Sequence, residues 1–431
     1  MGAIPDLMLN MNLNLEETTG ERRGFVHYYT VVFLWIIASF SFGNGYGQNG
    51  TLSVLDFGAH GDGVADDTQA FINAWNKLCS TSQLLKIPAG KTFVVKPFEL
   101  LGPCKFSSVI LQIDGNIVAP STRKGWGDVC KLGCWLCFRN VKGLIIKGGG
   151  LINGKGAIWW SQKTQFINAL HFIKCDQLQL SGFTSRDSPK IHIFIYNCHG
   201  VRISNIHVNA PENSPNTDGI DISLSSQVTI QDSVIRTGDD CVAIKGGSSF
   251  VNVTHVTCGP GHGFSLGSLG QDPTTEDKVE HIYFQNCNCE RTMNCARIKT
   301  YMGGVGYARE IFFKGMTLVQ SRNPILIDQH YVAVAANFPA KNGGVKVSEV
   351  EFIGFTGTSS SEEAITLDCS DLGCSNILMD HVILTSATGK PLRSVCRKAT
   401  GRATFTKPLV PCLSGKQSLS PTIAPISVDM H

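Results

Sequence analysis

Short apolar runs recur along the chain at intervals of about one structural coil, and this repetition constrains the fold more than any other feature of the sequence. Successive runs begin at Val201, Val228 and Val251, which are 27 and 23 residues apart. Most runs are followed by a turn of Asn, Gly or Ser and a second apolar pair, as expected for strand, tight turn, strand. Self-similarity at such a period indicates a solenoid.

Among repeat architectures of this size, a parallel β-helix fits best. A leucine-rich repeat needs Leu at fixed offsets, which the chain lacks, and a propeller needs about 40 residues per blade. In a parallel β-helix each strand pairs with the equivalent strand one coil away, about 4.8 Å along the axis. Inward positions are then buried on every coil and glycines serve the turns, in agreement with 45 glycines among 431 residues. We therefore predict an all-β solenoid.

One helix is expected before the repeats. Asp66 and Gln69 have the spacing of a capping box, and apolar residues from Ala70 to Trp75 recur at helical intervals. A helix here would close the N-terminal end of the solenoid, which would otherwise expose an edge for strand pairing.

The N-terminal segment predicts secretion. Residues 24–47 contain no Asp, Glu, Lys or Arg, the run from Val31 to Phe42 has the length of a signal-peptide core, and Gly45-Tyr46-Gly47 supplies small residues for cleavage. A membrane anchor is the less favoured alternative, and translation could begin at Met11. We expect residues 1–47 to be a leader and residues 48–431 to form a single domain.

Sixteen cysteines favour an oxidising compartment. We predict three disulfides, which join Cys241 to Cys258, Cys369 to Cys374, and Cys396 to Cys412. Zinc is the alternative for the closely spaced Cys130, Cys134 and Cys137, but no His follows at ligand spacing, so we expect no metal. In a secreted chain, Asn49 and Asn252 would be glycosylation sites.

The charge balance argues against a nucleic-acid partner. Without residues 1–47, Lys and Arg fall from 37 to 35 and Asp and Glu from 34 to 30, which leaves a net charge of about +5. No basic run with interleaved aromatic residues occurs. A weak positive excess is compatible with a polyanionic substrate.

Four polar motifs follow the period of the coils. From Asp218 to Asp240 is 22 residues, and from Asp240 to His262 is another 22, so a chain that coils with this period would stack them in one column. Each motif alone is more typical of a turn or a solvated strand face. Alignment in one column is what favours an active site. The motifs are Asn216-Thr217-Asp218-Gly219, Gly238-Asp239-Asp240-Cys241, Gly261-His262-Gly263 and Arg297-Ile298-Lys299.

Three neighbouring carboxylates suit glycoside hydrolysis. Asp218, Asp239 and Asp240 would repel one another, which raises at least one pKa and keeps a proton available in mildly acidic solution. One protonated carboxyl can donate to a leaving oxygen while ionised carboxylates activate water.

Taken together, these four motifs in this order and spacing resemble the signature motifs of the polygalacturonases, glycoside hydrolase family 28. The resemblance runs from about Phe57 to Leu413. Further segments resemble the plant branch of the family; they are Gly154 with Gly156, Trp159-Trp160, Ser214-Pro215, Cys258-Gly259-Pro260 and Asp328-Gln329-His330-Tyr331.

The resemblance implies a right-handed parallel β-helix that hydrolyses α-1,4-linked galacturonate in pectin with inversion, without metal or cofactor. It implies a secreted protein of the cell wall whose partner is pectin or homogalacturonan, and we expect a monomer. Asp239 resembles the general acid, Asp218 and Asp240 the pair that positions and deprotonates water, and His262 the histidine that supports the acid. The residues that match substrate-binding positions are Arg297, Lys299, Asn216 and Tyr331.

Two observations complicate the match. Carboxyls about 5 Å apart on adjacent coils would suggest retention by the general separation rule, whereas inversion usually leaves about 6.5–9.5 Å; we follow the family. The chain also departs from the plant pattern at three places: Asp221 stands where His is frequent, Cys295-Ala296 where Gly-Val is common, and Val332 where Cys is frequent. These departures bear on fine substrate preference and on one disulfide.

Two other functions remain as alternatives. A pectate or pectin lyase would cleave by β-elimination, and it would need an acidic calcium cluster and a basic proton abstractor. A non-catalytic or altered-specificity wall protein could bind pectin through the same groove. The motifs leave endo against exo action and tolerance of methyl esters open.

Overall fold

The computed structural model describes residues 50–127, 133–161, 167–332 and 344–413. The chain divides into residues 1–47 and a compact unit of residues 48–431, and only the second contains described residues. The predicted leader and the sequon at Asn49 lie outside the described residues. Within the described part of the chain, no helix is long and apolar enough to cross a membrane.

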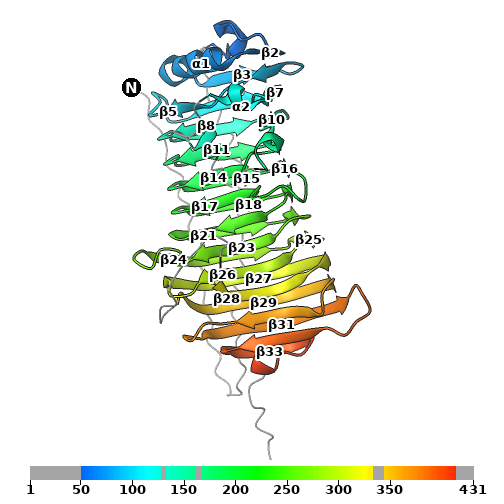
Figure 1. The fold of residues 1–431 in the computed structure, drawn as a ribbon. Helices are drawn as coiled ribbons and strands as arrows, with labels where there is room; N and C mark the ends of the chain where they lie inside the picture. The colour runs from blue at the N-terminus through cyan, green and yellow to red at the C-terminus, as the bar shows by residue number, and fades with distance from the viewer. Residues whose placement is uncertain (1–49, 128–132, 162–166, 333–343, 414–431) are drawn as a thin grey trace, which may run out of the picture. The chain divides into compact units, whose positions relative to one another are not determined.

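The described residues wind into a right-handed parallel β-helix, which confirms the predicted fold (Figure 1). Every pairing between named strands is parallel, and each joins one coil to the next. One face is an eleven-stranded sheet. In order along the axis its strands are β5 (Phe98–Leu101), β8 (Cys134–Arg139), β11 (Asn168–Ile173), β14 (Ile193–Tyr196), β17 (Ile220–Ser223), β20 (Asp240–Ile244), β23 (Gly263–Leu269), β26 (Asn294–Tyr301), β28 (Asn323–Tyr331), β30 (Glu363–Asp368) and β32 (Arg393–Arg397).

The other faces belong to a second sheet of two ladders that merge at β27. The first ladder contains β1 (Leu52–Ser53), β3 (Leu84–Ile87), β6 (Val109–Ile113), β9 (Leu144–Lys147), β12 (Gln179–Ser181), β15 (His199–Ser204), β18 (Ser226–Gln231), β21 (Ser248–Thr254), β24 (Glu276–Gln285), β27 (Val305–Ser321), β29 (Lys346–Ser359), β31 (Cys374–Ser386) and β33 (Ala399–Lys407). The second contains β2 (Asp62–Asp66), β4 (Thr92–Val94), β7 (Asn116–Val118), β10 (Leu151–Asn153), β13 (Thr184–Arg186), β16 (His207–Asn209), β19 (Val234–Arg236), β22 (Thr257–Cys258) and β25 (Asn288–Glu290).

Like residues stack on like along the interior of the solenoid. Ile193 pairs with Ile220, which in turn pairs with Val242 on the next coil. All three side chains are fully buried. Because alternate positions of each strand point inward, the apolar runs of the sequence become continuous columns, and their burial stabilises the fold by about 25 cal/mol per Å² of apolar surface.

A helix packs against the first coils, as predicted. Helix α1 (Thr68–Thr81) buries Phe71 and Trp75, and the Trp75 indole donates a hydrogen bond of 3.1 Å to the carbonyl of Leu101. The predicted capping box is wrong: Asp67 is the N-cap residue and makes no side-chain cap, because its carboxylate accepts bonds from His60 and Gly61 instead. The shorter helical turns are η1 (Val54–Phe57), α2 (Arg123–Trp126), η3 (Gly156–Ile158) and η4 (Pro411–Leu413).

All three predicted disulfides form. Three further bonds were missed by the sequence argument, namely Cys79–Cys104, Cys134–Cys137 and Cys289–Cys295. The bond between Cys134 and Cys137 removes the zinc alternative for this pair, since a disulfide leaves no thiolate to bind a metal. Cys130, the third residue of that alternative, lies outside the described residues.

The second sequon lies within a sheet. Asn252 is in the middle of β21, where it pairs with Thr229 on one side and Tyr283 on the other. Its side chain is partly buried. Glycosylation of Asn252 stays a prediction.

We expect Trp75→Ala to destabilise the protein by about 3–5 kcal/mol, because the change leaves a cavity between α1 and the first coils. Urea unfolding followed by circular dichroism would measure the loss. Lys77→Ala on the exposed side of the same helix is the control, with an expected change within about 0.5 kcal/mol. Equal midpoints for the two variants would show that α1 contributes nothing as a cap.

Candidate active site

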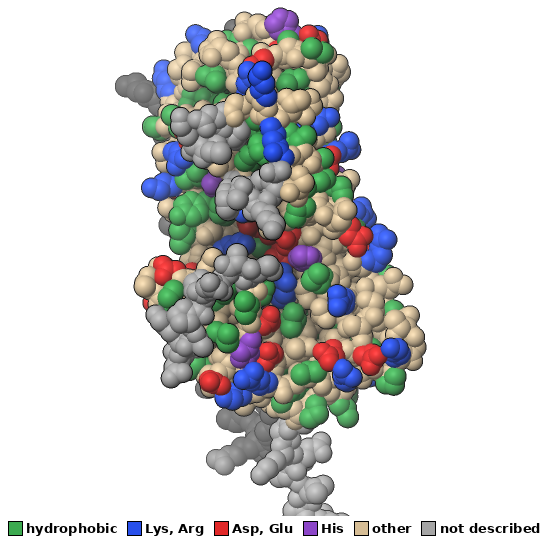
Figure 2. Space-filling view, in the orientation of Figure 1, with side chains coloured by type: hydrophobic (Ala, Val, Ile, Leu, Met, Phe, Trp, Pro, Cys, Tyr) green, Lys and Arg blue, Asp and Glu red, His purple; other side chains and the backbone are tan. Residues whose placement is uncertain are grey.

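The register of the eleven-stranded sheet brings the four predicted motifs together. Asp218 precedes β17, Asp240 begins β20, His262 precedes β23, and β26 carries Arg297 and Lys299. The Gly219 amide donates to the Asp240 carbonyl at 2.8 Å, and the His262 amide donates to the Asp239 carbonyl at 2.7 Å. Acidic, basic and histidine side chains gather in a hollow midway along this face (Figure 2).

Glycines allow the motifs to approach across neighbouring coils. A Cβ atom on Gly238 would overlap the carbonyl oxygen of Ser214, and one on Gly263 would overlap that of Asn294. Gly263 also has a φ of +96°, which disfavours L side chains. The glycines beside the acidic pair and beside His262 are therefore required by close packing of backbone on backbone.

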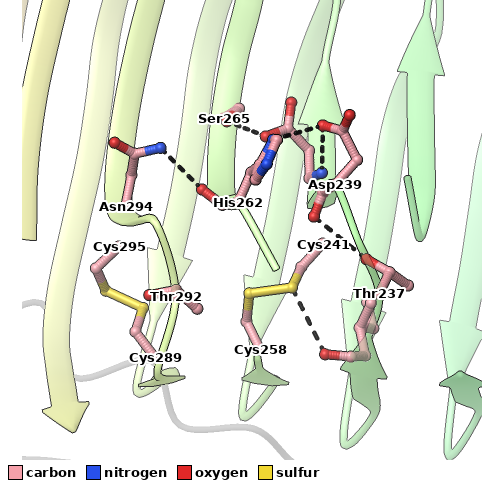
Figure 3. The surroundings of a disulfide bond; sticks show 12 residues. Thr237, Asp239, Cys241, Cys258, His262, Ser265, Cys289, Thr292, Asn294 and Cys295 are labelled. Atoms are coloured by element: carbon pink, nitrogen blue, oxygen red, sulfur yellow. Dashed lines mark hydrogen bonds and ion pairs between the residues drawn. A yellow bond between two sulfur atoms is a disulfide. The ribbon is translucent and has the colours of Figure 1, made fainter. Parts of the chain in front are cut away.

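Asp239 and His262 form a pair at the surface of the site (Figure 3). The distance from His262 Nδ1 to Asp239 Oδ1 is 2.9 Å, and the same carboxylate oxygen accepts a bond from the Asp240 amide at 2.8 Å. The His262 side chain is 29% exposed and the Asp239 side chain is 21% exposed. Asn294 Nδ2 donates to the His262 carbonyl at 3.1 Å, which fixes the backbone that carries the histidine.

A disulfide braces this pair. Cys241 follows the acidic pair and is bonded to Cys258, four residues before His262 (Figure 3). Both cysteines are buried, and they lie on the coils that carry Asp239 and His262. The disulfide therefore restricts how far the turn that carries Asp239 can separate from the turn that carries His262.

Asp240 is the buried anion of the site. Its Oδ1 pairs with Arg297 and accepts a bond of 2.8 Å from Ser265, while Oδ2 lies 2.9 Å from Lys299 Nζ. Burial alone would raise the pKa, but the two cations outweigh it and hold the pKa of Asp240 well below its usual range. Asp240 is thus ionised at any pH at which the protein would work. Lys299 also lies 5.4 Å above the ring of Tyr331.

Asp218 has the opposite electrostatic setting. Burial raises its pKa well above the ordinary value, and the neighbouring carboxylates of Asp221 and Asp239 raise it further. No cation pairs directly with it among the described residues. One carboxyl of the cluster can therefore hold a proton in mildly acidic solution, as the sequence argument required.

Asn216 is exposed in the turn before Asp218, with a φ of +54°. The structure gives its side chain no hydrogen bond to a described residue, so it faces solvent beside the carboxylates. Of the eight predicted site residues, Asn216 is the one that the described contacts do not tie to the others.

Ser265 and the pair of Asp221 with Lys245 were not predicted. Ser265 Oγ donates to Asp240 and accepts from Arg297 Nε at 2.9 Å, so it fixes both charges. Asp221 Oδ2 lies 3.2 Å from Lys245 Nζ. A signal for the second pair was present, because the departure at Asp221 introduced a buried carboxylate that needs a partner.

Among the described residues, one group with metal-ligand spacing lies at Asp239. Ligand atoms of Asp239, Asp240 and His262 lie within 4.8 Å of one another, and this spacing suits a metal. However, both oxygens of Asp240 are already engaged by Arg297 and Lys299. A metal ion would have to bind beside two positive charges, so the donor set fits a divalent ion poorly.

A parallel β-helix with a cluster of carboxylates, one ionised and one with a raised pKa, has the equipment of a polysaccharide hydrolase. Residues 79–405 match the model of the family Glycosyl hydrolases family 28. The chain belongs to this family and is a glycoside hydrolase.

Individual relatives agree with the family. The chain is 46% identical over 374 residues to a probable polygalacturonase of Arabidopsis thaliana, covering 85% of this chain and 81% of the relative. It is 42% identical over 348 residues to a polygalacturonase of Malus domestica, covering 78% and 74%. In fold it resembles the endo-xylogalacturonan hydrolase of Aspergillus tubingensis, with a TM-score of 0.67 and 23% identity over 85% of this chain and 99% of that chain.

We expect Asp218→Asn to stabilise the protein above about pH 5. A raised pKa in the folded state means that folding takes up a proton, so the free energy of unfolding falls as pH rises from the unfolded value of 3.8 towards the folded pKa. The amide removes this loss, which is about 1.4 kcal/mol per unit of pKa shift. Thermal unfolding from about pH 3.5 to 7 would measure it; a difference independent of pH would contradict the assignment.

We expect Asp240→Asn to lower the free energy of unfolding by about 3–5 kcal/mol, because Arg297 and Lys299 would be left buried beside a neutral amide. Asp239→Asn is the matched control, since Asp239 is partly exposed and its loss should cost about 1 kcal/mol or less. Denaturant titration of both variants at one pH compares them directly, and equal losses would refute the buried-anion role.

Proposed function

We propose that the protein is a secreted polygalacturonase that hydrolyses α-1,4-galacturonosyl linkages of pectin or polygalacturonate in the cell wall, acting as a monomer and without a metal. The observation that carries the proposal is the Asp240 group, in which Arg297 and Lys299 hold one carboxylate ionised beside a carboxyl of raised pKa. The names of the relatives from Arabidopsis thaliana and Malus domestica support the substrate.

Asp239 is the proposed general acid. It is the accessible carboxyl of the three and is hydrogen-bonded to His262. Its proton passes to the glycosidic oxygen as the bond from that oxygen to the anomeric carbon breaks, and the electron pair of the bond leaves with the oxygen.

Asp240 and Asp218 are proposed to hold and deprotonate the attacking water. Asp240 is a permanent anion, so it can accept a hydrogen bond from water at any working pH. The water oxygen forms a new bond to the anomeric carbon on the face opposite the leaving oxygen, and its proton passes to a carboxylate of the cluster. Inversion follows from attack on that face.

Arg297 and Lys299 are proposed to bind the galacturonate carboxylate as well as Asp240. A guanidinium carries five N–H donors and an ammonium three, more than the bonds to Asp240 and Ser265 consume. Tyr331 beside Lys299 would pack against the sugar, and Asn216 would contact it from the turn. The cations favour an acidic sugar over a neutral one.

The alternatives have less support. A lyase would need an acidic calcium cluster, and the candidate ligand Asp240 is already neutralised by two cations. A binding protein without activity would not require an ionised carboxylate beside one of raised pKa, which costs folding free energy.

The test measures reducing ends released from polygalacturonic acid at about pH 4–6 by the secreted protein, with a chelator present. We expect saturated products, and a loss of about 10²–10⁴-fold in rate for Asp239→Asn. Product sizes distinguish endo from exo action. Unsaturated products that disappear with the chelator would establish a lyase, and a folded wild type that releases nothing would favour the binding protein.

A further inference from the structure

A β-bulge lies near the end of β28, the strand that carries Tyr331. Strands β26 and β28 are neighbours in the eleven-stranded sheet (Figure 1), and they pair one to one as far as Lys299 with Asp328. The next pair is Tyr301 with Tyr331. From one pair to the next β26 advances from residue 299 to 301 and β28 from 328 to 331, so β28 contains one extra residue.

The extra residue decides which way Tyr331 faces. Alternate residues of a strand point to opposite faces of the sheet, and in β28 both Ile327 and Gln329 are fully buried while Asp328 between them is partly exposed. Strict alternation would place Tyr331 on the buried side, with Gln329. Instead Tyr331 is partly exposed, and its ring lies 5.4 Å from Lys299 Nζ. The bulge therefore turns the tyrosine out of the core and towards the candidate site.

The Gln329 side chain holds the inner side of the bulge. Its Nε2 donates to the Val345 carbonyl at 2.7 Å and to Thr300 Oγ1 at 3.3 Å. Its Oε1 accepts a bond of 3.1 Å from the Ser370 amide. All four residues are buried. The amide group thus uses its donors and its acceptor to tie β28 to three other segments of the chain, and its loss would leave buried backbone groups without this partner.

Polar groups hold the outer side of the bulge. The His330 amide donates to Asp328 Oδ1 at 3.0 Å, so a carboxylate serves a backbone group at the point where the ladder is interrupted. The His330 ring is fixed as well, because its Nδ1 lies 2.9 Å from Asp368 Oδ2 on the next strand of the sheet. The bulge is therefore bonded on both of its faces.

We propose that Gln329 is a positioning residue that secures this bulge and thereby aims Tyr331 at the sugar in the groove. A leucine of similar size would fill the same space in the core but would bond neither Val345 nor Ser370. The bulge would then lose its inner anchor, and Tyr331 would no longer be held beside Lys299. The inference rests on the proposed function, in which Tyr331 packs against the sugar, and it adds the residue that sets the orientation of that ring.

The test is a double-mutant cycle on KM and kcat for polygalacturonate at about pH 4.5. We expect Gln329→Leu and Tyr331→Ala each to raise KM about tenfold with kcat within about threefold, because each removes binding shared by substrate and transition state. The double variant should have the KM of Tyr331→Ala alone, since Gln329 acts through the tyrosine. General damage to the fold would instead add to the effect of Tyr331→Ala.

Two single variants complete the cycle. Gln329→Glu keeps the shape, and burial keeps its carboxyl protonated at about pH 4.5, so it can donate to Val345 and accept from Ser370; we expect a KM within about twofold of wild type. Gln179→Leu is the matched control, because Gln179 is an exposed glutamine of β12 on the other sheet, and its KM should be unchanged.

The outcomes separate this inference from the proposed function. If wild type hydrolyses polygalacturonate but Gln329→Leu has the KM of wild type, or weakens the enzyme equally with and without Tyr331, the positioning role is refuted and the hydrolase stands. If wild type releases no reducing ends, the proposed function itself fails. If Gln329→Leu does not fold, the same cycle is run with Gln329→Asn, whose shorter amide cannot reach both Val345 and Ser370, and additive effects there refute the role.

Discussion

Parallel pairing between successive coils is the interaction on which the rest of the structure depends. Pairs such as Ile220 with Val242 hold each strand in register with the next, so an interval along the sequence becomes a step along the axis. The columns of apolar residues inside and of charged residues outside follow from the same register. A shift of one residue would turn every inward side chain outward and separate the carboxylates.

The register of the coils places three aspartates, Asp218, Asp239 and Asp240, in different electrostatic surroundings. Asp240 is buried between two cations and a hydroxyl, Asp218 is buried beside other anions, and Asp239 reaches the surface next to His262. Burial alone would raise the pKa of both Asp218 and Asp240, so their neighbours decide which of the two stays ionised. The fold thus gives one residue type two opposite pKa shifts, raised at Asp218 and lowered at Asp240.

The sequence predicted the solenoid, the meeting of the four motifs and three disulfides, because each depends on spacing along a chain of regular coils. It missed Cys79–Cys104, which joins a residue of α1 to the segment after β5, 25 residues further along the chain, and it assigned Asp66 a cap that the structure does not contain. It treated Arg297 and Lys299 as substrate ligands and overlooked their pairing with Asp240, since spacing says nothing about where a long side chain ends. For the same reason, the departure at Asp221 did not identify Lys245 as its partner.

The position of the site along the stack has a consequence for robustness. The coils that carry Asp218, Asp240, His262 and Arg297 have several coils on either side (Figure 1). In a solenoid each coil is stabilised chiefly by its two neighbours, so thermal fraying begins at the ends. Loss of a terminal coil would leave the central strands paired, and the geometry of the candidate site would persist in a partly frayed molecule until unfolding reached the central coils.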